Sequence, residues 1–407
     1  MTTPPLSPPP RSRGLAALLA LPLLALAAAG GLAGAQQTPP PAPAPPAQPA
    51  PAPPGEPPPP ERPAGEFGEE LVVSEVVLDV LALDRKGDVV PGLGAEDFVV
   101  RQDGEPVEIT SVTFYTTRYE DLEQAGSQPP REGAEAAPDQ VPAARYLIFF
   151  FHDQTRFVDD PGELTRSRLE AARYARQWVR EEMRGSDWLA VLRYDYDLSV
   201  HADFTQDQEA LDGAIEEAIL GKAPAAMRPS DRRRGVAAGG PSLFQELPDS
   251  FRMSRATERP YDAIRLVAEA SGHIIGRKNL LLFSLGFGET GSMFRSPDPR
   301  YYPAMEEALN ANNVAVYPID LAGGSVETPQ TSFLSQLADD TGGELFKSFH
   351  SFLTPLLRVS GQTTGYYLLT FLAEHPAGES GYRKIEVDAK PRGVRVRARR
   401  GYRYGPG

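Results

Sequence analysis

Between residues 145 and 320, short apolar runs alternate with longer segments in which apolar residues recur every three or four positions. The run Tyr146 to Phe151 has no polar interruption, which predicts a strand buried on both faces. The three-to-four spacing predicts helices with one buried stripe. Further strands are predicted at 188–194, 279–284 and 314–320, and helices at 164–183, 205–218, 261–275, 305–312 and 333–340. Strands that alternate with helices indicate a mainly parallel sheet with right-handed crossovers.

Two details of this pattern make finer predictions. In the first helix the spacing places one set of residues on the buried face, namely Leu169, Ala172, Ala175, Val179 and Met183. In the last strand Pro318 has no backbone N–H to donate, so this strand is predicted to end there or to lie at an edge of the sheet.

The flanking segments have strand composition without helical periodicity. Residues 66–116 and 361–404 contain short β-branched and aromatic runs separated by turn residues such as Asp103-Gly104. Because a single hairpin is not stable alone, we expect these segments to pack together as a small β-sandwich. The predicted fold class is therefore α/β, a Rossmann-like domain over residues 143–360 plus this sandwich. Residues 117–142 are predicted to be an acidic linker, and residues 221–252, with Arg232-Arg233-Arg234, a surface insertion.

The first 65 residues differ in composition from the rest. Residues 1–35 combine Arg11 and Arg13 with an Ala/Leu core and a small-residue ending, which is typical of an export signal. An uncleaved membrane anchor is the alternative, and we favour cleavage. Residues 36–65 hold 15 of the 42 prolines and cannot form a core. They are predicted to be disordered. They are either a semi-rigid spacer or a tail that has no function of its own. We expect a periplasmic, cell-surface or secreted protein.

Composition excludes several classes of chemistry. The chain has no cysteine, so disulfides, thiolate metal sites and cysteine nucleophiles are excluded. Its formal net charge of −14 argues against a nucleic-acid partner, because binding to phosphates needs a basic field. Contact with a membrane is expected only through an uncleaved signal.

Candidate chemistry lies just past the first strand, where Asp153 and Thr155 follow its carboxyl end. Open α/β sheets bind ligands at this edge. A dehalogenase-like phosphatase needs a second aspartate at position 155, which is a threonine here. No Gly-x-Ser-x-Gly elbow and no phosphate-binding Gly-x-x-x-x-Gly-Lys-Ser/Thr loop occurs, so we expect no enzyme.

Several segments in this order carry a family resemblance. They are the strand that ends in Asp153, the 188–194 strand, Phe204 to Asp207, Tyr261 to Ile264, Gly276 to Ser284, Asn313 to Asp320 and Leu337 to Gly343. The chain resembles a von Willebrand factor type A domain and, more narrowly, the VWFA-related family of Acidobacteria. Gly92 to Phe98 and Arg399 to Tyr402 are similar to that family too.

The resemblance implies a metal-ion-dependent adhesion site. Asp153 stands at its first aspartate, Thr155 at a hydroxyl position and Thr257 near its second-loop threonine. Phe157 replaces a serine and Leu285 an aspartate, and neither side chain can ligate a metal. Asp195, Asp197 or Asp320 are possible substitutes. A hard ion with oxygen ligands, Mg²⁺ or else Mn²⁺ or Ca²⁺, would suit such a site. We favour a degenerate site with no metal, in which Asp153 and Thr155 only cap the loop.

The expected function is that of an exported, non-catalytic adhesion protein that binds a protein partner through its von Willebrand A-like domain. Two alternatives stay open at this point. One is a purely structural module of the cell envelope, and the other is a metal-dependent hydrolase on the same sheet.

Overall fold

The computed structural model describes residues 71–117, 144–154, 161–224, 240–288, 297–322, 329–347 and 350–405, with no side-chain description at 329–331. The predicted signal, the Pro/Ala segment, nearly all of the acidic linker and the arginine run of the insertion lie outside these residues. Glu66–Gly407 form one compact unit. No helix in the described ranges is long and apolar enough to cross a membrane.

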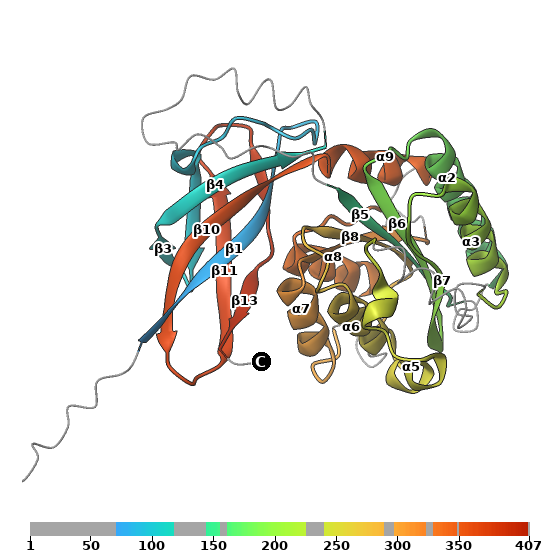
Figure 1. Cartoon of the computed structure of the whole chain (residues 1–407). Coiled ribbons are helices and arrows are strands. Elements are labelled where there is room, and N and C mark those ends of the chain that lie inside the picture. Colours follow the sequence, from blue (N-terminus) through green and yellow to red (C-terminus); the bar gives the residue numbers. More distant parts are fainter. Residues whose placement is uncertain are drawn as a thin grey trace, which may run out of the picture. The chain divides into compact units, whose positions relative to one another are not determined.

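The central sheet has five strands in the order β7-β6-β5-β8-β9 (Figure 1). They are β5 (Arg145–His152), β6 (Asp187–Asp195), β7 (Asp197–Thr205), β8 (Lys278–Ser284) and β9 (Val314–Asp320). Strand β5 pairs in parallel with β6 and β8, and β8 pairs in parallel with β9, whereas β7 returns antiparallel to β6. The carboxyl ends of four strands therefore meet at one edge.

Helices cover both faces of this sheet (Figure 1). One face packs α2 (Pro161–Glu181), α3 (Gln208–Leu220) and α9 (Leu353–Gln362). The other packs α5 (Ser250–Ala256), α6 (Pro260–Ala270), α7 (Tyr302–Ala311), α8 (Pro329–Thr341) and the short helix η4 (Leu243–Gln245). Because strand side chains alternate between faces, Phe149 and Phe151 enter the first core and Ile148 and Phe150 the second. This explains the uninterrupted apolar run.

The remaining strands form two antiparallel sheets. The first has the order β12-β1-β10-β4 and the second β13-β11-β2-β3. Their bounds are β1 (Leu71–Leu83), β2 (Phe98–Gln102), β3 (Glu105–Val107), β4 (Ile109–Thr116), β10 (Gly365–Pro376), β11 (Gly381–Ala389), β12 (Arg395–Arg397) and β13 (Gly401–Tyr404), and the short helix η1 (Ala95–Asp97) precedes β2. A shared core joins the two sheets. The predicted fold class, a mainly parallel α/β sheet plus a sandwich of N- and C-terminal strands, is confirmed.

Side chains of β11, of β13 and of the connection between β12 and β13 tie the sandwich to helix α7. Arg403 Nε lies 2.6 Å from Glu307 Oε1, and the hydroxyl of Tyr382 donates to Glu306 Oε1 at 3.0 Å. Arg399 also donates to the carbonyl of Asn310. These contacts hold the C-terminal strands against the α/β layers.

Three local features differ from the sequence prediction. Strand β7 and helix α9 were not predicted. The placement of Leu169 on the buried face of α2 is wrong, since 48% of this residue is exposed and Arg168 is buried instead. The prediction for Pro318 is confirmed, because β9 is an edge strand of the five-stranded sheet. On the outer side of β9 an isolated bridge joins Ile319 to Phe346, whose N–H donates to the Pro318 carbonyl at 2.9 Å.

Candidate functional site

The candidate site lies where the carboxyl ends of β5, β6, β8 and β9 meet. Asp153 follows β5 directly, and its N–H donates to the carbonyl of Tyr194 on β6 at 2.8 Å. This bond continues the parallel ladder by one residue and holds the backbone of Asp153 at the end of β5. Asp153 is buried, with 8% of its surface exposed.

Two arginines contact the Asp153 carboxylate. Arg193 Nη2 donates to Oδ2 of Asp153 at 2.8 Å, and Arg168 Nη2 lies 2.9 Å from the same oxygen as an ion pair without hydrogen-bond geometry. Arg193 Nη2 also donates to Asp195 Oδ2 at 2.7 Å. A guanidinium from β6 and another from α2 therefore occupy the surroundings of the carboxylate that the resemblance assigned to a metal.

Gln154 links the ends of β5 and β8. Its Oε1 accepts from the Ser284 hydroxyl at 3.1 Å and from the Leu285 N–H at 2.8 Å, and its Nε2 donates to the Gly286 carbonyl at 2.7 Å. Three hydrogen bonds from one buried amide make this part of the edge rigid.

His152, the last residue of β5, is also buried. Its Nδ1 lies 3.0 Å from the Ser284 hydroxyl oxygen, and its ring packs edge-on against Tyr194 and Phe287. Burial lowers the pKa of His152 to about 3, although the charge of Asp153 opposes this shift. The imidazole is therefore neutral at physiological pH. Because the Ser284 hydroxyl donates to Gln154, His152 Nδ1 is left as the donor to this serine.

Of the predicted ligand set, the structure describes Asp153 and Thr257. Thr257 is fully buried at the end of α5, where its hydroxyl donates to the Met253 carbonyl at 2.8 Å and accepts from the Leu198 N–H at 3.1 Å. It ties the start of β7 to α5, so its assignment near a metal position is not supported by these contacts. Thr155 and Phe157 lie outside the described residues. Leu285 places only a hydrocarbon side chain at the end of β8.

The three aspartates considered as substitutes are used in different ways. Asp195 is paired with Arg193, as described above, and Asp197 is half-buried at the start of β7. Asp320 ends β9, where its Oδ1 accepts from the Ala322 N–H at 2.9 Å and its Oδ2 is buried without a hydrogen-bond partner among the residues that the structure describes. Burial raises the pKa of Asp320.

These donors do not fit a divalent cation. An ion at Asp153 would meet two guanidinium charges, the hydroxyl of Thr257 is committed to backbone groups, and Leu285 offers no oxygen. Within the described ranges no three His, Cys, Asp or Glu side chains are grouped so as to hold a metal. We therefore assign no metal chemistry to this edge.

Sequence reasoning missed both arginines of the network, although each carried a signal. Arg193 is a charged residue inside the apolar run 188–194, and a charge in a buried strand requires a partner. Arg168 sits one position before Leu169 and shifts the buried stripe of α2. No sequence pattern predicted the conformation of Tyr196. This residue has a positive φ of 65° in the β6–β7 turn and is 51% exposed.

Comparisons with known proteins found similarity only at a low level, among solved structures. No protein-family model matches the chain, and a search of curated proteins found no match. Among solved structures, proximal thread matrix protein 1 from the mussel byssus is 15% identical with a TM-score of 0.33, covering 54% of this chain and 47% of that one. This chain thus spans about half of the mussel protein. The same protein is also matched in a form with a zinc-occupied MIDAS motif.

Two further matches come from prokaryotes. BatB from Bacteroides thetaiotaomicron is 11% identical with a TM-score of 0.32, covering 54% of this chain and 96% of that one. The ArnB paralog VWA2 from Sulfolobus acidocaldarius is 10% identical with a TM-score of 0.32, covering 81% and 75%. Likenesses of this strength carry no inference about function. The structural neighbours of the chain thus include von Willebrand A domain proteins.

Proposed function

We propose that this chain is an exported, non-catalytic protein-binding module whose von Willebrand A-like domain works without a metal ion. The observation that carries this proposal is the contact of the Asp153 carboxylate with Arg193 and Arg168. The two guanidinium groups supply the positive charge that a divalent cation would otherwise bring, and a cation beside them would be repelled. A narrower kinship with the VWFA-related family of Acidobacteria stays a prediction.

The β6–β7 turn is the part of this edge that we propose contacts the partner. Tyr196 projects there with half of its surface exposed, in a left-handed backbone conformation that is uncommon for a tyrosine. The neighbouring Asp195 is paired with Arg193, and this ion pair fixes the first side of the turn. Exposed tyrosines on rigid supports are frequent anchors of protein interfaces.

Export and tethering are proposed from the sequence. The signal-like residues 1–35 would direct the chain out of the cytoplasm, and the Pro/Ala-rich residues 36–65 would hold the folded unit at a distance from a membrane or envelope. The mussel protein with a zinc-occupied MIDAS motif has the metal-bound form of such a site, and we propose that the present chain replaces that ion with arginine.

The hydrolase alternative finds less support. The Ser284–His152 contact has the spacing of a nucleophile and its base, but Ser284 is fully buried and gives its proton to Gln154. A histidine with a pKa of about 3 is also a weak base at neutral pH. We therefore expect no turnover of p-nitrophenyl acetate or p-nitrophenyl phosphate beyond the buffer rate.

Calorimetric titration with Mg²⁺, Mn²⁺ and Ca²⁺ tests the absence of a metal. We expect no saturable heat from the full chain with any of the three ions. Saturable binding that disappears in Asp153→Ala would contradict the proposal and restore an adhesion site of the metal-dependent kind.

Affinity purification of the tagged chain from its own cells tests the binding surface. We expect a partner that the natural chain retains and Tyr196→Ala loses. Phe251→Ala is the matched control, because Phe251 is also an exposed aromatic residue, at 67%, but lies on α5. Equal retention of every partner by all three chains would refute the assignment of the β6–β7 turn.

A further inference from the structure

Strand β1 has one edge that is open over half of its length. It pairs with β10 from Leu71 to Val80, whereas β12 covers its other edge only at Leu81–Leu83. Among the described strands nothing pairs with this second edge between residues 71 and 77. The carbonyl of Val77 on this edge accepts instead from Arg399 Nη2 at 2.6 Å. Because alternate residues point their backbone groups to the same side, residues 71, 73 and 75 present theirs to this edge as well.

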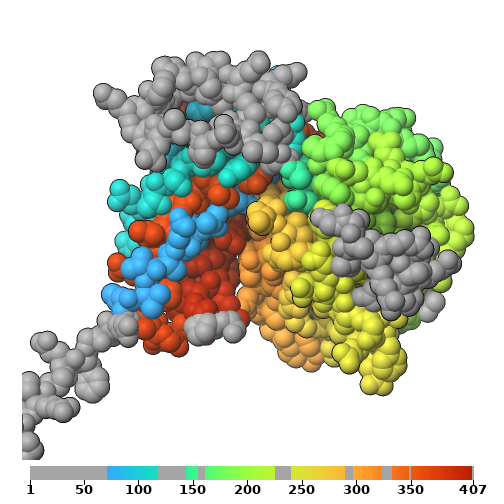
Figure 2. Space-filling model, viewed as in Figure 1, coloured from blue at the N-terminus to red at the C-terminus, as the bar shows by residue number. Residues whose placement is uncertain are grey.

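The open edge is apolar and exposed. Leu71, Val72, Val73 and Val77 each have 40% or more of their surface exposed, and Figure 2 shows these first residues of β1 at the surface. Soluble proteins normally protect edge strands with charges, prolines or a covering segment. Here Glu75 is the one charged residue from 71 to 77. An unprotected edge of this kind is a template for strand addition.

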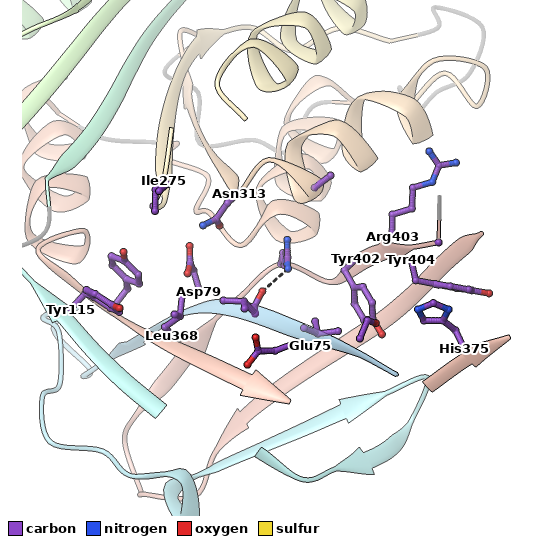
Figure 3. A pocket seen from close by; sticks show the side chains of 18 residues that line it. Glu75, Asp79, Tyr115, Ile275, Asn313, Leu368, His375, Tyr402, Arg403 and Tyr404 are labelled. Atoms are coloured by element: carbon purple, nitrogen blue, oxygen red, sulfur yellow. Dashed lines mark hydrogen bonds between the residues drawn. The ribbon is translucent and has the colours of Figure 1, made fainter. Parts of the chain in front are cut away.

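A groove of about 650 Å³ runs along this edge. Ser74 to Val77 form one wall, Tyr402 to Gly405 in and after β13 form a second, and Ile275 and Asn313 lie on the opposite side (Figure 3). Strand β13 is itself the edge strand of the other sheet of the sandwich. A segment added to the open edge of β1 would lie in this groove, between Tyr402 to Gly405 on one side and Ile275 and Asn313 on another.

The two faces of the edge differ in chemistry. Val76 faces the sandwich core that also holds Tyr402, and His375 lines the same groove with an Nδ1 that is buried without a partner among the described residues. The opposite face carries Val73, Glu75 and Val77. The carboxylate of Glu75 makes no ion pair within the described part of the chain. An added strand would therefore meet an apolar face on one side and an unneutralised carboxylate on the other.

We propose that this groove binds an extended peptide segment of a partner protein, which adds to β1 as a further strand. The side chains of the bound peptide that face the sandwich core are apolar. On its other face a lysine or arginine lies opposite Glu75, because charges of opposite sign attract when they face each other on neighbouring strands. The main-chain hydrogen bonds supply affinity, and the Glu75 pair supplies sequence preference. This site is lined by strands of the sandwich and by Ile275 and Asn313 of the α/β layers, and it is separate from the β6–β7 turn proposed above.

A phage-displayed heptapeptide library provides a direct test on the full chain. We expect enrichment of peptides with apolar residues at alternate positions and a basic residue at one fixed position. The variant Val73→Pro removes an N–H from the open edge only and leaves the pairing with β10 intact, so a selected synthetic peptide should bind it about tenfold more weakly. Thermal unfolding verifies that Val73→Pro is folded.

The second variant, Glu75→Lys, changes the charge and keeps the backbone. Selection on this variant should enrich Asp or Glu at the position where the natural chain selects Lys or Arg. Tyr196→Ala should bind the selected peptides as the natural chain does, which separates this site from the other proposal.

Three outcomes would overturn the proposal. The first is that the natural chain enriches no peptides beyond those enriched on Val73→Pro. The second is that the selected peptides bind the natural chain and Val73→Pro equally well. The third is a concentration-dependent dimer in analytical ultracentrifugation that Val73→Pro abolishes, because a second copy of the chain would then occupy the edge.

Discussion

Arg193 Nη2 lies 2.8 Å from Asp153 Oδ2 and 2.7 Å from Asp195 Oδ2, so one guanidinium group joins the ends of two neighbouring parallel strands. Arg168 reaches Asp153 from helix α2 at 2.9 Å. The four charges form a compact group of two cations and two anions. This arrangement can stabilise the carboxyl edge of the sheet without any bound ion.

Removing the central carboxylate should destabilise the fold. Asp153→Ala leaves two largely buried guanidinium groups beside Asp195 alone, and breaking a buried pair in this way costs about 3–5 kcal/mol. Urea unfolding of both chains measures this loss. Asp388→Ala is the control, because its pair with Arg101 at 2.7 Å is exposed and should be worth less than about 1 kcal/mol. A comparable small loss for both variants would show that the Asp153 network is not structural.

Acid should weaken the fold through two buried histidines. Burial lowers the pKa of His152 to about 3 and that of His201 to about 4, whereas both titrate near 6.5 when unfolded. Between these values the unfolded chain binds more protons, so this contribution to stability is complete above pH 6.5 and is lost as the pH falls toward 3. Each histidine can contribute up to about 1.4 kcal/mol per pH unit within its window.

The measurement is the free energy of unfolding as a function of pH between 7 and 5, a range above most carboxylate titrations. His152→Asn should show a smaller slope than the natural chain. His273→Asn is the matched control, because His273 is exposed, and it should keep the natural slope. An unchanged slope in His152→Asn would mean that this histidine is accessible to protons in the folded state.

The parts of the fold that could be predicted from sequence are those in which one local pattern dominates. The apolar run of β5 is buried on both faces and therefore has no competing interpretation. Strand β7 was not predicted, although Leu198, Val200, Ala202 and Phe204 alternate with more polar residues. The capping pattern at Thr205 to Gln208 at its end predicts the helix that follows but gives no sign of the strand before it. The observed N-cap of α3 is Asp207, whose side chain accepts from the N–H groups of Glu209 and Ala210.

The candidate site was harder to predict, because its partners are distant in sequence. Asp153 was identified by its position after a strand, and this position is correct. The residues that determine its chemistry, Arg168 and Arg193, lie 15 and 40 positions away and are brought together only by the packing of α2 and β6 on β5. Burial of Arg168 also explains why Leu169 faces solvent, since adjacent helical residues cannot share one narrow face.

Gly343 should tolerate no side chain. A Cβ atom at this position would lie 1.8 Å from the carbonyl oxygen of Val316 on β9. Gly343→Ala must therefore push α8 away from the sheet, at a cost of about 1–3 kcal/mol or more. Gly213→Ala is the control of opposite sign, because no atom beyond its neighbours in the chain and the backbone of α3 itself would lie within 4 Å of its Cβ, and alanine should stabilise the helix by about 0.5–1 kcal/mol. Thermal unfolding compares the two, and an unchanged midpoint for Gly343→Ala would contradict the close packing of α8 on β9.

Loss of the C-terminal strands should expose the core of the sandwich. A chain that ends at residue 360 lacks β10, which lies between β1 and β4 in the first sheet, and with it the buried side chains of Tyr367, Leu369 and Phe371. Val76, Leu78 and Val80 of β1 would then lose the strand that they pair with and most of their shared core. We expect this chain to aggregate in size-exclusion chromatography with light scattering. Residues 144–362 alone retain both helical cores and serve as the control that should stay monomeric. A monomeric, cooperatively unfolding chain that ends at residue 360 would show instead that β1 to β4 fold without their C-terminal partners.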